Sequence, residues 1–66
     1  MAPRTRRVTV RAYNLHTGDV PVTVGLPVLS AVVYRGGQDE WVDVMYSNGL
    51  DILHPDDLVT VTRTYA

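Results

Sequence analysis

Apolar and polar residues alternate at a spacing of two in several short segments of this chain, and this spacing dominates over the helical one. The clearest case is residues 41–46, in which one face carries Val42, Val44 and Tyr46. The opposite face carries Trp41, Asp43 and Met45. Alternation of this kind is typical of a half-buried β-strand. The pattern therefore predicts an all-β protein.

Alternation also predicts strands at residues 7–13 and 59–63, a dense apolar run predicts one at 29–34, and residues 50–54 are expected as the return strand of a hairpin. Residues 20–24 also alternate, but Pro21 cannot donate to a β-ladder, so this segment is expected as an edge strand or an extended loop arm. Asn48-Gly49 predicts a hairpin turn, because both residues tolerate positive φ.

The size of the chain limits how it can be stabilised. Sixty-six residues make one domain, and no cysteine is present to cross-link it. We expect a flexible basic arm over residues 1–6 and a single domain over residues 7–66. No apolar run approaches the roughly 20 residues of a membrane span. Together with the absence of cysteine, this favours a cytoplasmic protein without membrane contact.

The order of segments between residues 31 and 61 resembles an SH3-like or Tudor-like small barrel. An apolar strand at residues 31–34 is followed by a Gly-Gly turn, the strand at 41–46, the Asn-Gly hairpin and the strand at 50–54. Pro55-Asp56-Asp57-Leu58 then precedes the last strand. The resemblance implies a five-stranded SH3-like barrel, with a 3₁₀ turn before the last strand and Leu58 plugging one end.

The sequence contains few residues that could form a catalytic or metal-binding site. The only candidates for a nucleophile and base are Ser30, Ser47, His16 and His54, and the two serines lie in an apolar strand and a turn. His54, Asp56 and Asp57 supply too few nitrogen ligands for zinc and no calcium-loop spacing, and the aspartates are expected to cap a turn. We predict no enzyme activity, no metal and no cofactor.

Charge is unevenly distributed along a chain whose net charge is −1. The first eleven residues contain Arg4, Arg6, Arg7 and Arg11, whereas all acidic residues lie between Asp19 and Asp57. An arginine-rich strand leaves nucleic-acid binding, including transcription regulation, as an alternative function. Every basic residue except histidine is arginine, which is typical of high-GC coding sequences and suggests an actinobacterial or actinobacteriophage source.

The aromatic residues support the leading hypothesis, a non-enzymatic protein–protein interaction module such as a phage accessory protein that binds a host protein. The predicted protein-binding residues are Trp41, Met45, Tyr34 and Tyr46, with Asp39, Glu40 and Asp43 setting charge complementarity. Two alternatives keep Trp41 inside: it folds over the barrel end, or the strand register is inverted. A structural phage or virion subunit paired through its edge strands is a third possible function, and monomer and homo-oligomer both stay open.

Overall fold

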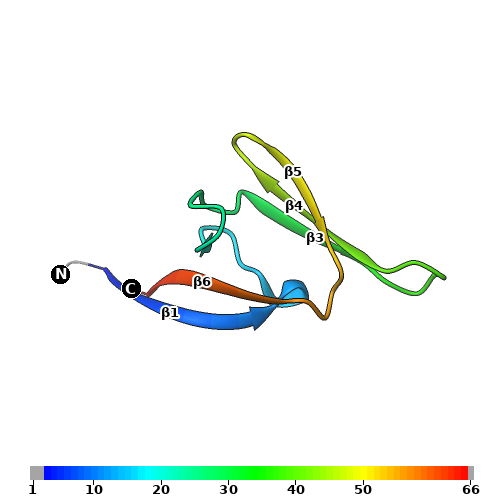
Figure 1. Cartoon of the computed structure of the whole chain (residues 1–66), viewed down its shortest axis with the longest axis horizontal. Helices are drawn as coiled ribbons and strands as arrows, with labels where there is room; N and C mark the ends of the chain where they lie inside the picture. The colour runs from blue at the N-terminus through cyan, green and yellow to red at the C-terminus, as the bar shows by residue number, and fades with distance from the viewer. Residues whose placement is uncertain (1–2, 66) are drawn as a thin grey trace.

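The computed structural model describes residues 3–65 and contains almost only β-structure (Figure 1). Its elements are β1 (Arg4–Arg11), the 3₁₀ helix η1 (Ala12–Asn14), β2 (Val20–Pro21), β3 (Ser30–Tyr34), β4 (Trp41–Tyr46), β5 (Gly49–Leu53) and β6 (Leu58–Tyr65). The described strands form two three-stranded antiparallel sheets, ordered β1-β6-β2 and β3-β4-β5. The expectation of an all-β protein is confirmed.

The first sheet joins the two ends of the chain. β1 and β6 pair along their whole length, from Arg4 opposite Tyr65 to Arg11 opposite Leu58. As a result, Arg4 and Tyr65 lie side by side at one end of the molecule (Figure 1). Val8 and Val10 of β1 are half-buried and the intervening Thr9 is exposed, as the alternation predicted.

The second sheet is a meander, in which β4 is the central strand between β3 and β5. The predicted hairpin is present, with Tyr46 opposite Gly49 and residues 47–48 in the turn. Only the glycine takes a positive φ, of 145°, and Asn48 does not. The turn therefore needs the conformational freedom of Gly49, while the asparagine keeps an ordinary backbone.

The expected five-stranded barrel is wrong in its closure, because the structure has six strands in two sheets that no continuous strand connects. Strand β2 ends at Pro21. The amides of Val24 and Gly25 both donate to the Pro21 carbonyl, at 3.0 and 2.9 Å. These bonds curl residues 22–24 into a turn, so that β2 ends where the expected strand at 20–24 would have continued.

The 3₁₀ segment expected before the last strand is also misplaced. The described 3₁₀ helix is η1, after β1, whereas residues 54–57 form a single turn in which the Asp57 amide donates to the His54 carbonyl at 3.0 Å. Leu58 does not plug the molecule, since it is 67% exposed. Val59 and Val61 take the inward positions of β6, and alternation then turns Leu58 toward solvent.

Small apolar side chains from both sheets make the core. Its buried members are Ala12, Leu15, Val28, Val42, Val44, Tyr46 and Val61. The inward position of Val42, Val44 and Tyr46 confirms the predicted register of β4. The inverted register, with Trp41 and Met45 inside, is wrong.

A buried ion pair joins the loop after η1 to β6. Asp19 is only 2% exposed, and Arg63 binds it in a bidentate manner, with Nε donating to Oδ1 at 2.9 Å and a terminal nitrogen donating to Oδ2 at 2.8 Å. The His16 amide also donates to Oδ2, at 2.8 Å, and Arg63 further donates to the carbonyl of Asn14 at 3.1 Å. All these groups are therefore satisfied inside the protein, as a buried charge requires.

Loss of one partner from this pair should destabilise the fold strongly. Arg63→Met leaves a buried carboxylate without its counter-charge, and we expect the free energy of unfolding to fall by about 3 kcal/mol. The free energy of unfolding is measured by urea denaturation, with circular dichroism as the signal. The control is Arg7→Met on the exposed side of β1, for which we expect a change within about 0.5 kcal/mol. Equal losses in the two variants would contradict a structural role of the pair.

The same pair makes stability depend on pH. Burial raises the pKa of Asp19, but the hydrogen bonds from Arg63 and the His16 amide outweigh it and hold the pKa below its ordinary 3.8. Because the folded-state pKa is lowered, the stabilisation is complete above the unfolded value and is lost as the pH falls through the folded one. Between neutral pH and pH values below 3.8, wild type should therefore lose more unfolding free energy than Asp19→Asn, measured by urea titration at each pH. Parallel losses would show that Asp19 is not the responsible group.

Candidate binding surfaces

The outward side of sheet β3-β4-β5 is largely apolar. Cross-strand register places Tyr34 opposite Trp41, Met45 opposite Ser30 and Leu50, and Asp43 between Val32 and Ile52. We define the outer apolar face as the surface formed by six residues of this side: Val32, Tyr34, Trp41, Met45, Leu50 and Ile52. Their exposed fractions lie between 36% for Trp41 and 61% for Ile52.

Trp41 and Tyr34 form an aromatic pair at one end of this face. Their rings stack with 4.9 Å between centroids and 20° between planes. The pair is directly cross-strand, in the geometry through which neighbouring side chains stabilise a sheet. Trp41 therefore packs against Tyr34 and still presents about a third of its surface. It does not close over the core as a second buried cluster.

The other predicted protein-binding residues are divided between three places. Asp43 is half-buried at the centre of the outer apolar face. Asp39 and Glu40 are exposed in the loop between β3 and β4, next to Trp41. Tyr46 lies on the inward side of β4 and is 6% exposed, so the structure does not bring it to the face that Trp41 and Met45 share.

Three members of the outer apolar face were not predicted, namely Val32, Leu50 and Ile52. A signal for two of them existed in the sequence. The Asn-Gly hairpin fixes the register of β4 against β5, which sets Leu50 opposite Met45 and Ile52 opposite Asp43. Val32 depends on the pairing of β3 with β4 across the longer loop at residues 35–40, for which the sequence offers no comparable signal.

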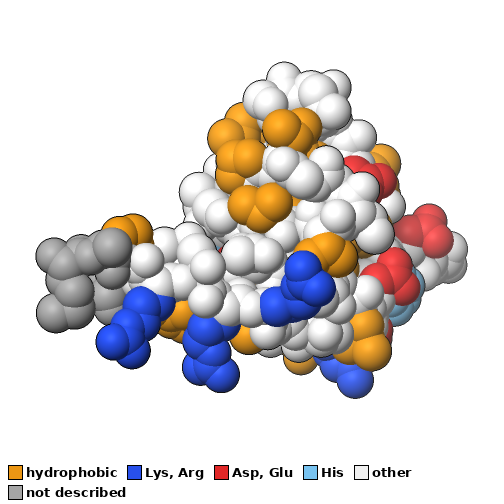
Figure 2. Space-filling model, turned by 60° about the vertical axis from the view of Figure 1, so that its left-hand side comes forward, with side chains coloured by type: hydrophobic (Ala, Val, Ile, Leu, Met, Phe, Trp, Pro, Cys, Tyr) orange, Lys and Arg blue, Asp and Glu red, His pale blue; other side chains and the backbone are white. Residues whose placement is uncertain are grey.

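The four N-terminal arginines are exposed on β1 and do not share one face. Arg7 and Arg11 lie on the side away from the core, while Arg4 and Arg6 lie on the other side, beyond the half-buried valines. Of the arm expected at residues 1–6, residues 1 and 2 lie outside the described part, and residues 4–6 pair with the end of β6. In Figure 2 most basic side chains lie along the lower part of the molecule, and the acidic ones gather at its right-hand side.

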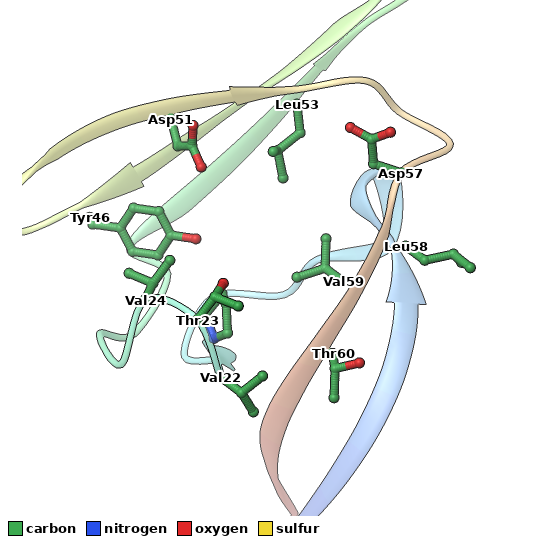
Figure 3. Close-up of a pocket in the computed structure, with 11 residues that line it drawn as sticks. Val22, Thr23, Val24, Tyr46, Asp51, Leu53, Asp57, Leu58, Val59 and Thr60 are labelled. Atoms are coloured by element: carbon green, nitrogen blue, oxygen red, sulfur yellow. The ribbon is translucent and has the colours of Figure 1, made fainter.

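A cavity of about 440 Å³ opens between the two sheets (Figure 3). We name it the inter-sheet cavity. Its apolar lining includes Val22, Val24, Leu53 and Val59, and its polar lining includes Tyr46, Asp51 and Asp57. Sequence reasoning missed it, because these residues come from the turn after β2 and from three strands of both sheets.

Asp51 and Asp57 are both held by backbone amides at this cavity. The Ile52 amide donates to Asp51 Oδ1 at 3.0 Å, and the His54 amide donates to Asp57 Oδ2 at 3.1 Å. Asp57 therefore caps the turn at residues 54–57, as expected from the sequence. Burial, followed by the negative charge of Asp51, raises the pKa of Tyr46 above its ordinary 10.0. The phenol is therefore neutral at physiological pH.

The serines and histidines considered for catalysis lie in four different segments, with His16 in the loop after η1 and His54 in the turn before β6. Ser30 lies in β3 and Ser47 in the hairpin turn. His54 Nδ1 accepts a hydrogen bond from the Asp56 amide at 3.1 Å. Within residues 3–65, no group of three or more histidine, cysteine, aspartate or glutamate residues is placed to hold a metal ion.

Comparison of the chain with protein-family models, with curated proteins and with solved structures finds no match. The part of the chain described by the structure also contains no helix long and apolar enough to cross a membrane. Arguments about function therefore depend on the surfaces themselves.

The aromatic pair can be tested through the fluorescence of Trp41, the only tryptophan. Tyr34→Ala removes the stacked ring, so we expect more efficient acrylamide quenching and a loss of about 1 kcal/mol in unfolding free energy. Tyr65→Ala, at the far end of β6, is the control and should leave the quenching unchanged. Unchanged quenching in Tyr34→Ala would contradict the stack.

Proposed function

We propose that this chain is a non-enzymatic protein–protein interaction module that binds its partner through the outer apolar face. The observation that carries the proposal is the exposure of six neighbouring apolar side chains on one side of sheet β3-β4-β5. An antiparallel sheet that covers a core usually presents polar residues on its other side. Here both sides are apolar, which is typical of a sheet that a second molecule covers.

Two features make this face suitable for a specific interaction. The stacked pair Tyr34 and Trp41 offers a large rigid surface with few rotatable bonds, and aromatic residues of this kind concentrate binding energy. Asp43 at the centre of the face, with Asp39 and Glu40 beside Trp41, favours a partner that brings basic groups to an apolar contact.

The order of strands supports an SH3-like architecture in an opened form. The first strand pairs with the last, a three-stranded meander follows, and a short turn precedes the last strand. Small barrels of this kind serve many unrelated functions, so the binding proposal depends on the outer apolar face and not on the architecture. The absence of cysteine supports a cytoplasmic setting for the interaction.

The proposal predicts that Trp41→Ala and Ile52→Thr weaken partner binding without unfolding the chain. Both side chains are exposed, so we expect a folded protein and a loss of affinity of about thirtyfold for Trp41→Ala. The measurement is retention of proteins from an actinobacterial lysate on the tagged chain, with and without nuclease, followed by titration of the retained protein.

The matched control is Leu29→Thr, which replaces an exposed apolar residue that belongs neither to the outer apolar face nor to the lining of the inter-sheet cavity. It should retain the same protein as wild type. Retention by all variants alike would overturn the proposal, and circular dichroism shows that each variant is folded.

Nucleic-acid binding through β1 is the second candidate. It is favoured by the separation of charge, since β1 carries +4 from its four arginines while residues 35–57 carry −5. Retention that disappears with nuclease would support it. Binding should then fall steeply with salt, and Arg7→Gln with Arg11→Gln should reduce the salt dependence.

A further inference from the structure

The inter-sheet cavity is partly lined by apolar residues and is large enough for a side chain. Its volume of about 440 Å³ lies within the range of small-molecule sites. Leu53 and Val59 point into it from opposite sheets, and Val24 lies beside the Tyr46 ring (Figure 3). An aliphatic stem entering between these residues would replace water over apolar surface.

The polar lining of the cavity is acidic. Asp51 and Asp57 reach it from β5 and from the turn before β6, and none of the described residues that line it is basic. Each carboxylate binds a backbone amide through one oxygen, which orients the group and leaves its second oxygen for a ligand. The cavity therefore favours a cation and disfavours an anion.

Tyr46 adds a third polar group inside the cavity. The residue is 94% buried, since only 6% of it is exposed, and its hydroxyl points into the cavity from the inward side of β4 (Figure 3). None of the hydrogen bonds formed by the described residues engages this hydroxyl. The hydroxyl is not a buried unsatisfied atom, so it is accessible from the cavity and can accept a hydrogen bond from a ligand.

We propose that the inter-sheet cavity binds an arginine side chain presented by an extended segment of a partner protein. The stem lies against Leu53 and Val59, and the guanidinium donates to Asp51 and the Tyr46 oxygen, which lie at one end of the cavity (Figure 3). Asp57, at the other end, adds to the negative charge of the lining. Arginine fits better than lysine, because its planar fork offers five donors in fixed directions to neighbouring acceptors. The site is independent of the outer apolar face, which lies on the other side of the same sheet.

The test is a titration of the ¹⁵N-labelled chain with the peptide acetyl-Gly-Arg-Gly-amide, followed by amide chemical shifts. We expect saturable shifts at Val24, Leu53 and Val59, with little change at Trp41 and Met45. The same peptide with lysine should bind more weakly, and the peptides with leucine or glutamate should not bind.

Two conservative variants locate the contact. Asp51→Asn keeps an oxygen for the Ile52 amide and removes the charge, and it should raise the dissociation constant about fivefold. Tyr46→Phe keeps the buried ring and removes the hydroxyl. This variant should raise the dissociation constant about threefold. The control Asp56→Asn changes the charge equally at a residue that does not line the cavity, and should bind as wild type does.

Several results would overturn the proposal. These are equal binding of the leucine or lysine peptide, equal weakening by Asp56→Asn, shifts confined to the outer apolar face, and no shifts at the millimolar concentrations that so small a ligand requires. The chain could instead form a dimer at low salt that Asp51→Asn abolishes. In that case the bound arginine would come from β1 of a second copy, and not from a separate partner. The Trp41→Ala experiment tests the other face, so either proposal can fail without the other.

Discussion

The arrangement of the two sheets depends on the buried pair of Asp19 and Arg63. The pair connects residues 44 positions apart, from a loop without regular structure to the central strand of the first sheet. Asp19 also accepts the Val28 amide through its carbonyl at 2.8 Å, and Gly18 donates to Val28 at the same distance. Val28 is fully buried just before β3 begins. The ion pair therefore fixes where the second sheet starts relative to the first, and with it the walls of the inter-sheet cavity.

The core that holds these sheets together is small, and most of its members are valines or smaller residues. A chain of this size buries a modest fraction of its surface, so each large side chain left outside is a loss to its own stability. Nevertheless, tryptophan, methionine and isoleucine, which could have filled the interior, lie on the outer apolar face. Their position is accounted for if they gain their burial from a partner instead of from the fold, which is the physical basis of the proposed interaction.

Local patterns predicted much of this molecule, and contacts distant in sequence account for the rest. Alternation located β1, β4, β5 and β6, and Asn48-Gly49 located the hairpin. Pro21 marked an irregular strand, but the curl of residues 22–24 onto its carbonyl depends on tertiary packing and opened the expected barrel. Nothing local indicates that Asp19 meets Arg63, or that Tyr46 and Asp51 line a cavity together with residues of the other sheet. For the same reason the outer apolar face was predicted only in part, through the residues of β4 itself.

Strand β4 contributes to both proposed surfaces, because its successive side chains point to opposite sides. Trp41 and Met45 lie on the outer apolar face, while Tyr46 faces the cavity. A slip of one residue in its pairing would exchange the two sets, burying Met45 and exposing Val44. The hairpin at Gly49 holds one end of the strand and the stack of Trp41 on Tyr34 holds the other. The register of this single strand thus determines which residues lie on the outer apolar face and which line the cavity, so both proposed surfaces depend on the turn glycine and on the aromatic pair.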